Sequence, residues 1–239
     1  MLFRLKDFYQ EKDGGIEIPP VSASRFAKEI AGDFNPIHDS DGKRFCVPGD
    51  LLFSLVLDQC SLSQNMEFVF SGMVGAGVVL LFPQSPDDHF SIADANGKTY
   101  LEVSRSGGVC EDTSVILAMI QNYVSFSGHN FPDLLVPLMA QHKVMINPDR
   151  PLVIYERMSF HFDHLDFSAP KLELTSTELQ VNGKRGDAYL RFRILSNGNQ
   201  VGTGSKKLVL SGLRDYDADL VHSMTNAYLA KRDAYVGLG

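Results

Sequence analysis

Hydrophobic and polar residues alternate along much of the chain, in the pattern typical of antiparallel strands with one covered face. Asn96-Gly97 and Asn197-Gly198 separate neighbouring segments and have the composition of hairpin turns. The segments predicted as strands, or rich in strand-forming residues, are 68–72, 77–82, 90–92, 98–104, 115–126, 158–162, 171–181, 187–195 and 200–210.

Helical spacing of apolar residues marks four further segments. Residues 22–32 predict a helix with Phe26, Ala27 and Ile30 facing inward, which ends near Gly32. Residues 51–60 are apolar on almost every side, so they predict a buried helix. Segment 130–142 is a second apolar helix candidate despite Pro137, and 217–235 predicts an amphipathic helix packed outside.

The order of these elements occurs twice. In each half, an apolar helix is followed by strands, although the two halves share little residue identity. We therefore predict an α+β protein with two similar units, residues 1–127 and residues 128–239.

Composition narrows the classes of function. The chain has 239 residues, 44% hydrophobic and 21% charged, with a formal net charge of −7. This charge disfavours nucleic-acid binding, and the apolar runs are too short to cross a bilayer. The N-terminus lacks the apolar core of a signal peptide. Cys46, Cys60 and Cys110 lack motif spacing and fit reduced thiols, so we expect a cytoplasmic protein.

Candidate chemistry is concentrated in residues 33–38, Asp-Phe-Asn-Pro-Ile-His. Pro36 cannot donate a backbone hydrogen bond and biases Asn35 away from helical geometry. The chain must therefore turn sharply between Asp33 and His38. Such a turn can aim both side chains at one point, as a general acid/base pair requires.

The string Gly32-Asp-Phe-Asn-Pro-Ile-His38, followed by Phe45-Cys-Val-Pro-Gly49-Asp-Leu-Leu, resembles the MaoC-like (R)-specific enoyl-CoA hydratases. The resemblance covers roughly residues 22–55. It implies the hotdog fold, in which an antiparallel sheet wraps a central helix. With the two-half layout, it implies a double hotdog of two such sheets and helices. The second half has no Asp-x-Asn-Pro-x-His string, so we expect one site per chain.

The resemblance also implies site residues. Asp33 and His38 would be the catalytic acid/base pair, and Asn35 would shape their turn. The Gly49 N–H, at the positive start of a helix, would bind the thioester oxygen as enolate charge develops. Phe34, Pro48 and Asp50 are expected to contact the substrate. Family members commonly carry His-Gly-Met where this chain has Pro48-Gly49-Asp50.

If the protein is an enzyme, the resemblance implies a lyase of fatty acid metabolism, an enoyl-CoA hydratase or 3-hydroxyacyl dehydratase. The substrate would be an acyl thioester linked to CoA or to a carrier protein, with no cofactor and no metal. A thioesterase on the same fold and a non-catalytic acyl-binding protein are the alternatives. Both a monomer of two hotdog halves and a homodimer are open.

Other candidate groups have simpler interpretations. Adjacent residues rarely converge on one ion, so His38, Asp39 and Asp41 make a poor metal site. His161 and His164 are interpreted as surface or cross-strand residues, and Cys46 lacks the fixed basic partner that a nucleophile needs. The strand phenylalanines are interpreted as core residues: Phe68, Phe70, Phe160 and Phe162.

Overall fold

The structure is a computed structural model that describes residues 4–128 and 130–237. Its helices are α1 (Pro20–Arg25), the π-helix η2 (Phe26–Ala31), α2 (Gly49–Cys60), α3 (Thr113–Gly128), α4 (Leu135–Gln141) and α5 (Ala218–Ala234), with 3-10 turns η1 (Leu5–Phe8) and η3 (Pro36–His38). Its strands are β1 (Gln10–Lys12), β2 (Gly15–Glu17), β3 (Leu62–Phe70), β4 (Val79–Leu80), β5 (His89–Ala93), β6 (Thr99–Cys110), β7 (Val144–Met145), β8 (Val153–Phe162), β9 (Lys171–Asn182), β10 (Arg185–Ser196), β11 (Asn199–Ser211) and β12 (Arg214–Asp215).

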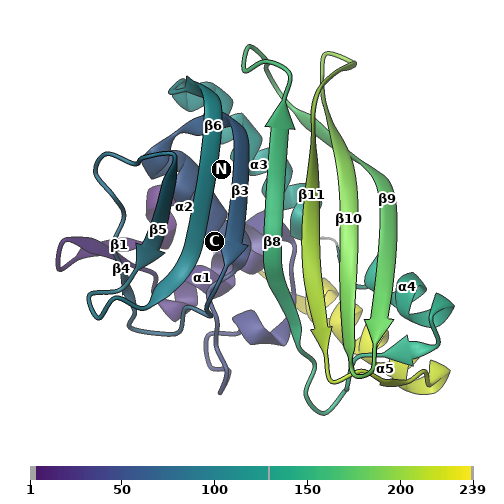
Figure 1. Cartoon of the computed structure of the whole chain (residues 1–239). Coiled ribbons are helices and arrows are strands. Elements are labelled where there is room, and N and C mark those ends of the chain that lie inside the picture. Colours follow the sequence, from purple (N-terminus) through teal and green to yellow (C-terminus); the bar gives the residue numbers. More distant parts are fainter. Residues whose placement is uncertain (1–3, 129, 238–239) are drawn as a thin grey trace.

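Seven antiparallel strands form one sheet in the order β5-β6-β3-β8-β11-β10-β9. The helices lie behind this sheet in the view of Figure 1. The two halves of the chain meet at the β3–β8 pair, where Asn65 lies opposite His161 and Val69 opposite Arg157. Small sheets β1-β2-β4 and β12-β7 lie outside the main sheet.

The halves repeat one arrangement. In the first, α2 leads into β3, which lies at the junction beside β6 and then β5. In the second, α3 precedes β8, which lies at the junction beside β11, β10 and β9. Each half is thus a helix packed on an antiparallel sheet, and the fold is the expected α+β double hotdog. The two sheets are joined edge to edge into one.

The predicted strand-forming segment 115–126 is wrong, because these residues form helix α3. β-branched and aromatic residues suggested a strand, yet the buried positions are spaced as on a helix: Ile116, Met119, Ile120, Tyr123, Val124 and Ser127. The Asp112 carboxylate accepts hydrogen bonds from the Ser114 N–H at 2.7 Å and the Val115 N–H at 3.4 Å, as a helix N-cap does. Burial of this face outweighs the local β-propensity.

The other helix predictions are largely confirmed. Residues 22–32 lie in α1 and η2, with Phe26 and Ala27 buried and Ile30 half-buried. Helix α2 is buried on almost every side, and α5 packs outside. Within 130–142 only α4 is helical, and it is not the central helix of the second half. The division at residue 127/128 stays a prediction. Helix α3, which occupies the place of the central helix in the second half, lies before this division except for Gly128.

An aromatic cluster joins α2, α3 and the sheet. The Phe53 ring lies 5.4 Å from Phe68, 4.7 Å from Tyr123 and 5.6 Å from Phe160, measured between centroids. Phe68, Phe160 and Phe162 are buried, as predicted for core residues. Phe70 is only partly buried and stacks on Tyr155 at 4.6 Å. Because this cluster draws on both halves, the halves share a core, and a second buried cluster lies within the second half around α4, β10 and β11.

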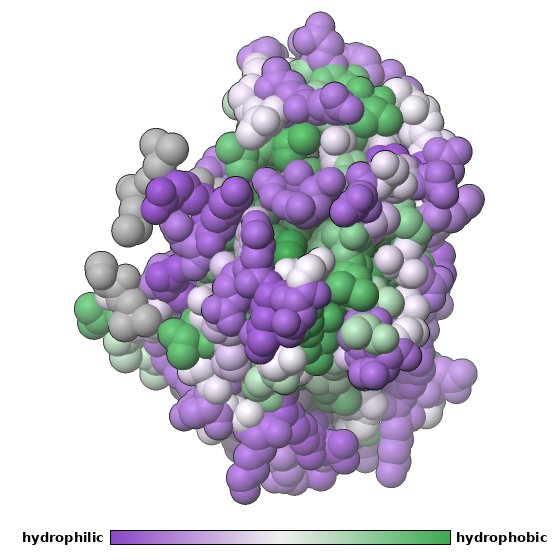
Figure 2. All heavy atoms as spheres, turned by 90° about the vertical axis from the view of Figure 1, so that its left-hand side faces the viewer, coloured by the Kyte–Doolittle hydropathy of each residue, from purple (hydrophilic) through white to green (hydrophobic). Residues whose placement is uncertain are grey.

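The surface is mainly polar on the face shown in Figure 2, where hydrophilic residues predominate and smaller apolar areas lie between them. None of the helices among the described residues has the length and apolar character needed to span a membrane.

Candidate active site

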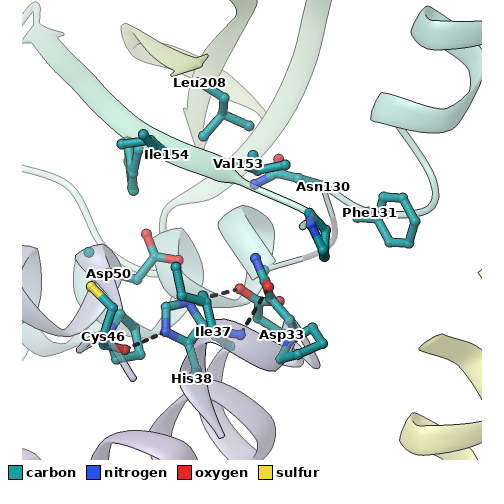
Figure 3. Close-up of a pocket in the computed structure, with 18 of the residues that line it drawn as sticks. Asp33, Ile37, His38, Cys46, Asp50, Asn130, Phe131, Val153, Ile154 and Leu208 are labelled. Carbon is teal, nitrogen blue, oxygen red and sulfur yellow. Dashed lines mark hydrogen bonds and ion pairs between the residues drawn. The ribbon is translucent and has the colours of Figure 1, made fainter. Parts of the chain in front are cut away.

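A cavity of about 790 Å³ lies between the two halves of the molecule. In the close-up of Figure 3, Asp33, His38 and the start of α2 lie on one side, and Val153, Ile154 and Leu208 lie across from them. The first side comes from the first half, and the opposite side from β8 and β11 of the second half. The cavity therefore exists only where the halves meet.

The end of η2 presents Asp33 to this cavity. Gly32 adopts a left-handed conformation with φ of 71°, and the Asp33 N–H donates to the Ala27 carbonyl at 2.8 Å. These features form a helix C-terminal cap, for which glycine is the preferred residue. The cap ends the helix and turns the chain so that Asp33 faces the cavity.

Asn35 organises the turn that follows. Its N–H donates to Asp33 Oδ1 at 2.9 Å, and its own Oδ1 accepts from the Ile37 N–H at 3.2 Å. Asn35 is thus the N-cap of the 3-10 turn η3, with Pro36 at the first position. One short segment holds both the Asp33 carboxylate and the start of the turn that carries His38.

His38 faces Asp33 with a defined tautomer. His38 Nδ1 lies 2.7 Å from the Cys46 carbonyl oxygen, which can only accept, so Nδ1 donates a proton. His38 Nε2 lies 3.6 Å from Asp33 Oδ2. The side chains are 12% and 28% exposed, respectively, so both are sheltered but reachable. In the neutral ring, the lone pair of Nε2 therefore faces the carboxylate.

The start of α2 forms the adjacent wall. Pro48 is the N-cap and provides no side-chain cap. Leu51 and Leu52 donate to the Pro48 carbonyl, while no described residue accepts a hydrogen bond from the Gly49 or Asp50 N–H. These N–H groups mark the positive end of the helix. A Cβ on Gly49 would lie 2.8 Å from Tyr155 Cδ1, so the Tyr155 ring packs here only because residue 49 has no side chain.

Asp50 belongs to a buried polar network. Ser127 Oγ donates to Asp50 Oδ1 at 2.8 Å, and Lys206 Nζ donates to Ser127 Oγ. Burial raises the pKa of the Asp50 carboxyl, although Lys206 and Ser127 oppose the shift. Burial likewise lowers the pKa of Lys206, although the negative charges of Asp50 and Asp33 act to raise it. The network provides this wall with one acidic and one basic group.

Helix α5 holds the Asp33 turn from outside. The Tyr228 hydroxyl accepts from the Phe34 N–H at 3.1 Å and donates to the Gly32 carbonyl at 3.4 Å. Lys231 and Lys28 pair with Asp39 at 2.6 Å and 3.0 Å. The C-terminal helix thus fixes the peptide groups on both sides of Asp33.

The other residues considered as catalytic or metal-binding groups either lie away from Asp33 and His38 or are in the wrong protonation state for catalysis. Burial raises the pKa of the Cys46 thiol to about 11, so it stays protonated near neutral pH. His161 is exposed and bonds to Asn65 Oδ1 at 2.5 Å, and His164 is also exposed. Among the described residues, no group of three or more His, Cys, Asp or Glu side chains could hold a metal ion.

All seven predicted site residues line the same cavity: Asp33, Phe34, Asn35, His38, Pro48, Gly49 and Asp50. Sequence reasoning missed Ser127, Lys206 and Tyr228, which line it from the second half or its border. Of these three, only Lys206 could have been found from the sequence. In the alternating pattern of its strand, it falls on the same face as the buried residues Leu208 and Leu210. A charged residue in that phase must find buried partners.

Comparison with solved structures finds low-identity matches. The tesB protein of Mycobacterium avium subs paratuberculosis is 9% identical over 69% of this chain and 87% of its own, with a TM-score of 0.41. Acyl-CoA thioesterase II TesB2 from Mycobacterium marinum is 9% identical over 71% of this chain and 90% of its own, with a TM-score of 0.40. A conserved protein of unknown function with hot dog fold from Alicyclobacillus acidocaldarius is 8% identical over 88% and 99%, with a TM-score of 0.45.

A search of curated protein sequences gives no match. One protein-family model matches residues 3–219, which include the Asp33–His38 turn, the start of α2 and both strands opposite them. The chain therefore belongs to the family described as "Protein of unknown function (DUF3581)".

Proposed function

We propose that this protein binds an acyl thioester in the cavity between its halves and hydrates an enoyl thioester, or dehydrates a 3-hydroxyacyl thioester. The observation that carries the proposal is the placement of Asp33, His38 and the start of α2 on one cavity. An acid/base pair beside free N–H donors is what reversible addition of water next to a thioester requires. The apolar side chains across from them suit an acyl chain.

Asp33 and His38 are suited to hold the attacking water. With the proton on Nδ1, His38 Nε2 and Asp33 Oδ2 are two acceptors 3.6 Å apart. A water can donate one O–H to each. The imidazole or carboxylate then takes one proton as the oxygen adds to the β-carbon, and a proton is delivered to the α-carbon. The reverse sequence removes water.

The start of α2 is suited to stabilise the enolate that forms between these steps. The thioester oxygen would accept hydrogen bonds from the Gly49 N–H and the neighbouring Asp50 N–H, which no described residue uses. Removing one such donor typically slows an enzyme by about 10²–10³-fold. The Asp50 side chain is compatible with this role, because Ser127 binds its carboxylate and Lys206 supplies the opposite charge.

A test measures hydration of crotonyl-CoA and of longer enoyl-CoAs, with Asp33→Asn and His38→Ala as variants. Each variant should lose about 10²–10⁴-fold in kcat, the range for one general acid/base group. His161→Ala is the matched control, because His161 is exposed on the sheet and should leave kcat unchanged. Unchanged turnover in both site variants would sink the proposal.

A thioesterase is the second candidate, and the observation that favours it is a pair of carboxylates, Asp33 and Asp50, on one cavity. Either could hold a water that attacks the thioester carbonyl carbon while the α2 N–H groups bind its oxygen. Thiol release from saturated acyl-CoAs separates hydrolysis from hydration. Acyl-CoA binding without either reaction would identify a non-catalytic acyl-binding protein.

The identity of the thioester carrier, CoA or a carrier protein, stays a prediction to be tested with both substrates. A cytoplasmic location, a monomeric or homodimeric state and the absence of nucleic-acid binding are likewise predictions. Fractionation, sedimentation and a nucleic-acid binding assay test them in turn.

A further inference from the structure

A buried lysine lies against the cavity wall at the start of α2. Lys206 is 3% exposed and is the one buried member of the lysines and arginines that the structure describes. The next residue, Lys207, lies on the opposite face of the sheet, where it pairs with Glu156 at 2.5 Å and Asp187 at 3.5 Å. Because burying an ammonium group is costly, its surroundings must supply compensation.

Three groups surround the Lys206 ammonium. It donates to Ser127 Oγ, approaches the Ser127 carbonyl oxygen at 3.4 Å, and lies 4.2 Å from the centroid of the Tyr155 ring. The ring contact is a cation–π interaction. Ser127 Oγ in turn donates to Asp50 Oδ1 at 2.8 Å. One hydroxyl therefore connects the buried cation to the buried carboxylate.

Each of the two charges also complements the helix end beside it. Asp50 is in the first turn of α2, the positive end of that helix. Ser127 is in the last turn of α3, so Lys206 faces the negative end of that helix. Together, Asp50 and Lys206 have a net charge close to zero. Without Lys206, however, the negative charge of Asp50 would be uncompensated beside the position proposed for the enolate oxygen.

We infer that Lys206 is a positioning residue for this site: acting through Ser127, it balances the Asp50 carboxylate, so that the α2 N–H groups stay effective donors to the thioester oxygen. The inference rests on the proposed function. Lys206 itself touches no reacting atom in this account. Removing its charge alone should expose the developing enolate to an uncompensated carboxylate, and removing both charges should restore a neutral wall.

The experiment measures kcat and KM for the enoyl-CoA that the wild type hydrates best. The variants are Lys206→Met, Asp50→Asn, the double variant D50N/K206M, and Lys207→Met as the matched control. We expect Lys206→Met to lower kcat by about 100-fold or more, as when an oxyanion donor is lost, with KM within about threefold. The double variant should recover to within about tenfold of the wild type, and Lys207→Met should stay within about twofold.

Two results would overturn the inference: a folded Lys206→Met protein with wild-type kcat, or a double variant no faster than Lys206→Met. Circular dichroism establishes folding. If Lys206→Met does not fold, the double variant is compared with Asp50→Asn. The two should match within about tenfold, and a double variant about 100-fold slower would contradict charge balance.

A wild type that turns over no enoyl or 3-hydroxyacyl thioester would count against the proposed function instead. The affinity for an anionic CoA analogue that mimics the enolate, with a nitronate in place of the thioester, then decides the inference across the same proteins. Lys206→Met should bind this analogue at least about tenfold more weakly, and the double variant should recover. Equal affinities across the set, or no binding by the wild type, would overturn it.

Discussion

Helices α2 and α3 occupy equivalent places in the two halves, yet they reach the cavity by opposite ends. α2 contributes its first turn, with Gly49 and Asp50, and α3 contributes its last turn, with Ser127 and Gly128. The positive end of one helix and the negative end of the other thus meet at one wall. The two halves thus contribute opposite helix ends to one cavity wall. The Asp50 carboxylate complements the positive end of α2, and the Lys206 ammonium complements the negative end of α3.

The two ends also differ in how closely the chain packs around them. A Cβ on Gly128 would lie 1.7 Å from the Ala31 carbonyl oxygen, which is backbone of η2. A Cβ on Gly49 would meet the Tyr155 ring, a side chain rather than backbone, at 2.8 Å. The end of α3 therefore packs directly on the backbone of the segment that leads to Asp33, whereas the start of α2 packs on a side chain. Two glycine variants test this difference directly, and two variants of α5 then test how the Asp33 segment is held from its other side, from the largest expected effect to the smallest.

Gly128→Ala should destabilise the protein most. Because the obstacle is backbone, η2 and α3 must separate, and we expect a loss of about 3 kcal/mol or more in the free energy of unfolding. Urea denaturation measures it. Gly75→Ala is the matched control, since no atom lies within 4 Å of its added Cβ and its change should be within about 0.5 kcal/mol. Equal losses for the two variants would refute the close approach.

Gly49→Ala should cost less, about 1–2 kcal/mol, because the new methyl group meets a side chain rather than backbone and overlaps it less, at 2.8 Å against 1.7 Å. The same denaturation series gives the value. A loss as large as that of Gly128→Ala would show that both helix ends are equally rigid, and the comparison would fail.

Tyr228→Phe should loosen the Asp33 turn. The change leaves the buried Phe34 N–H without its acceptor, which typically costs about 1 kcal/mol or slightly more. We also expect about a tenfold fall in kcat for the enoyl-CoA, because Asp33 is no longer held on both sides. The control is Tyr235→Phe, whose hydroxyl bonds to Glu29 at an exposed position. A kcat that falls equally in both variants would argue against a role specific to Tyr228.

Lys231→Ala should have the smallest effect, about 0.2–1 kcal/mol, because its pair with Asp39 is partly exposed. Burial alone would raise the pKa of Asp39, but Lys231 and Lys28 hold it below its ordinary value of 3.8. A carboxyl with a lowered pKa stabilises the folded state above 3.8 and loses this contribution as the pH falls through the folded value. The difference between wild type and variant should therefore be constant from pH 7 to about 5 and shrink below 3.8. A difference that grows in acid would contradict the pairing.

The local parts of the site were predictable from sequence. Gly32, Asn35 and Pro36 act through neighbouring backbone groups, so their turn follows from short-range rules. The buried character of α2 followed from its composition. By contrast, α3 was predicted wrongly, because its β-branched residues favoured a strand until a covered face favoured the helix. Tyr228 could not be predicted, since its partners Gly32 and Phe34 lie nearly two hundred residues away in the chain.

That separation has a consequence for how the protein acquires its site. The Asp33 turn is synthesised nearly two hundred residues before the helix that carries Tyr228. Contacts between distant segments also form slowly, because a long loop must close first. A chain arrested before α5 would thus hold the acid and the imidazole without the contacts that fix them. The site becomes complete only once α5 has packed against this turn.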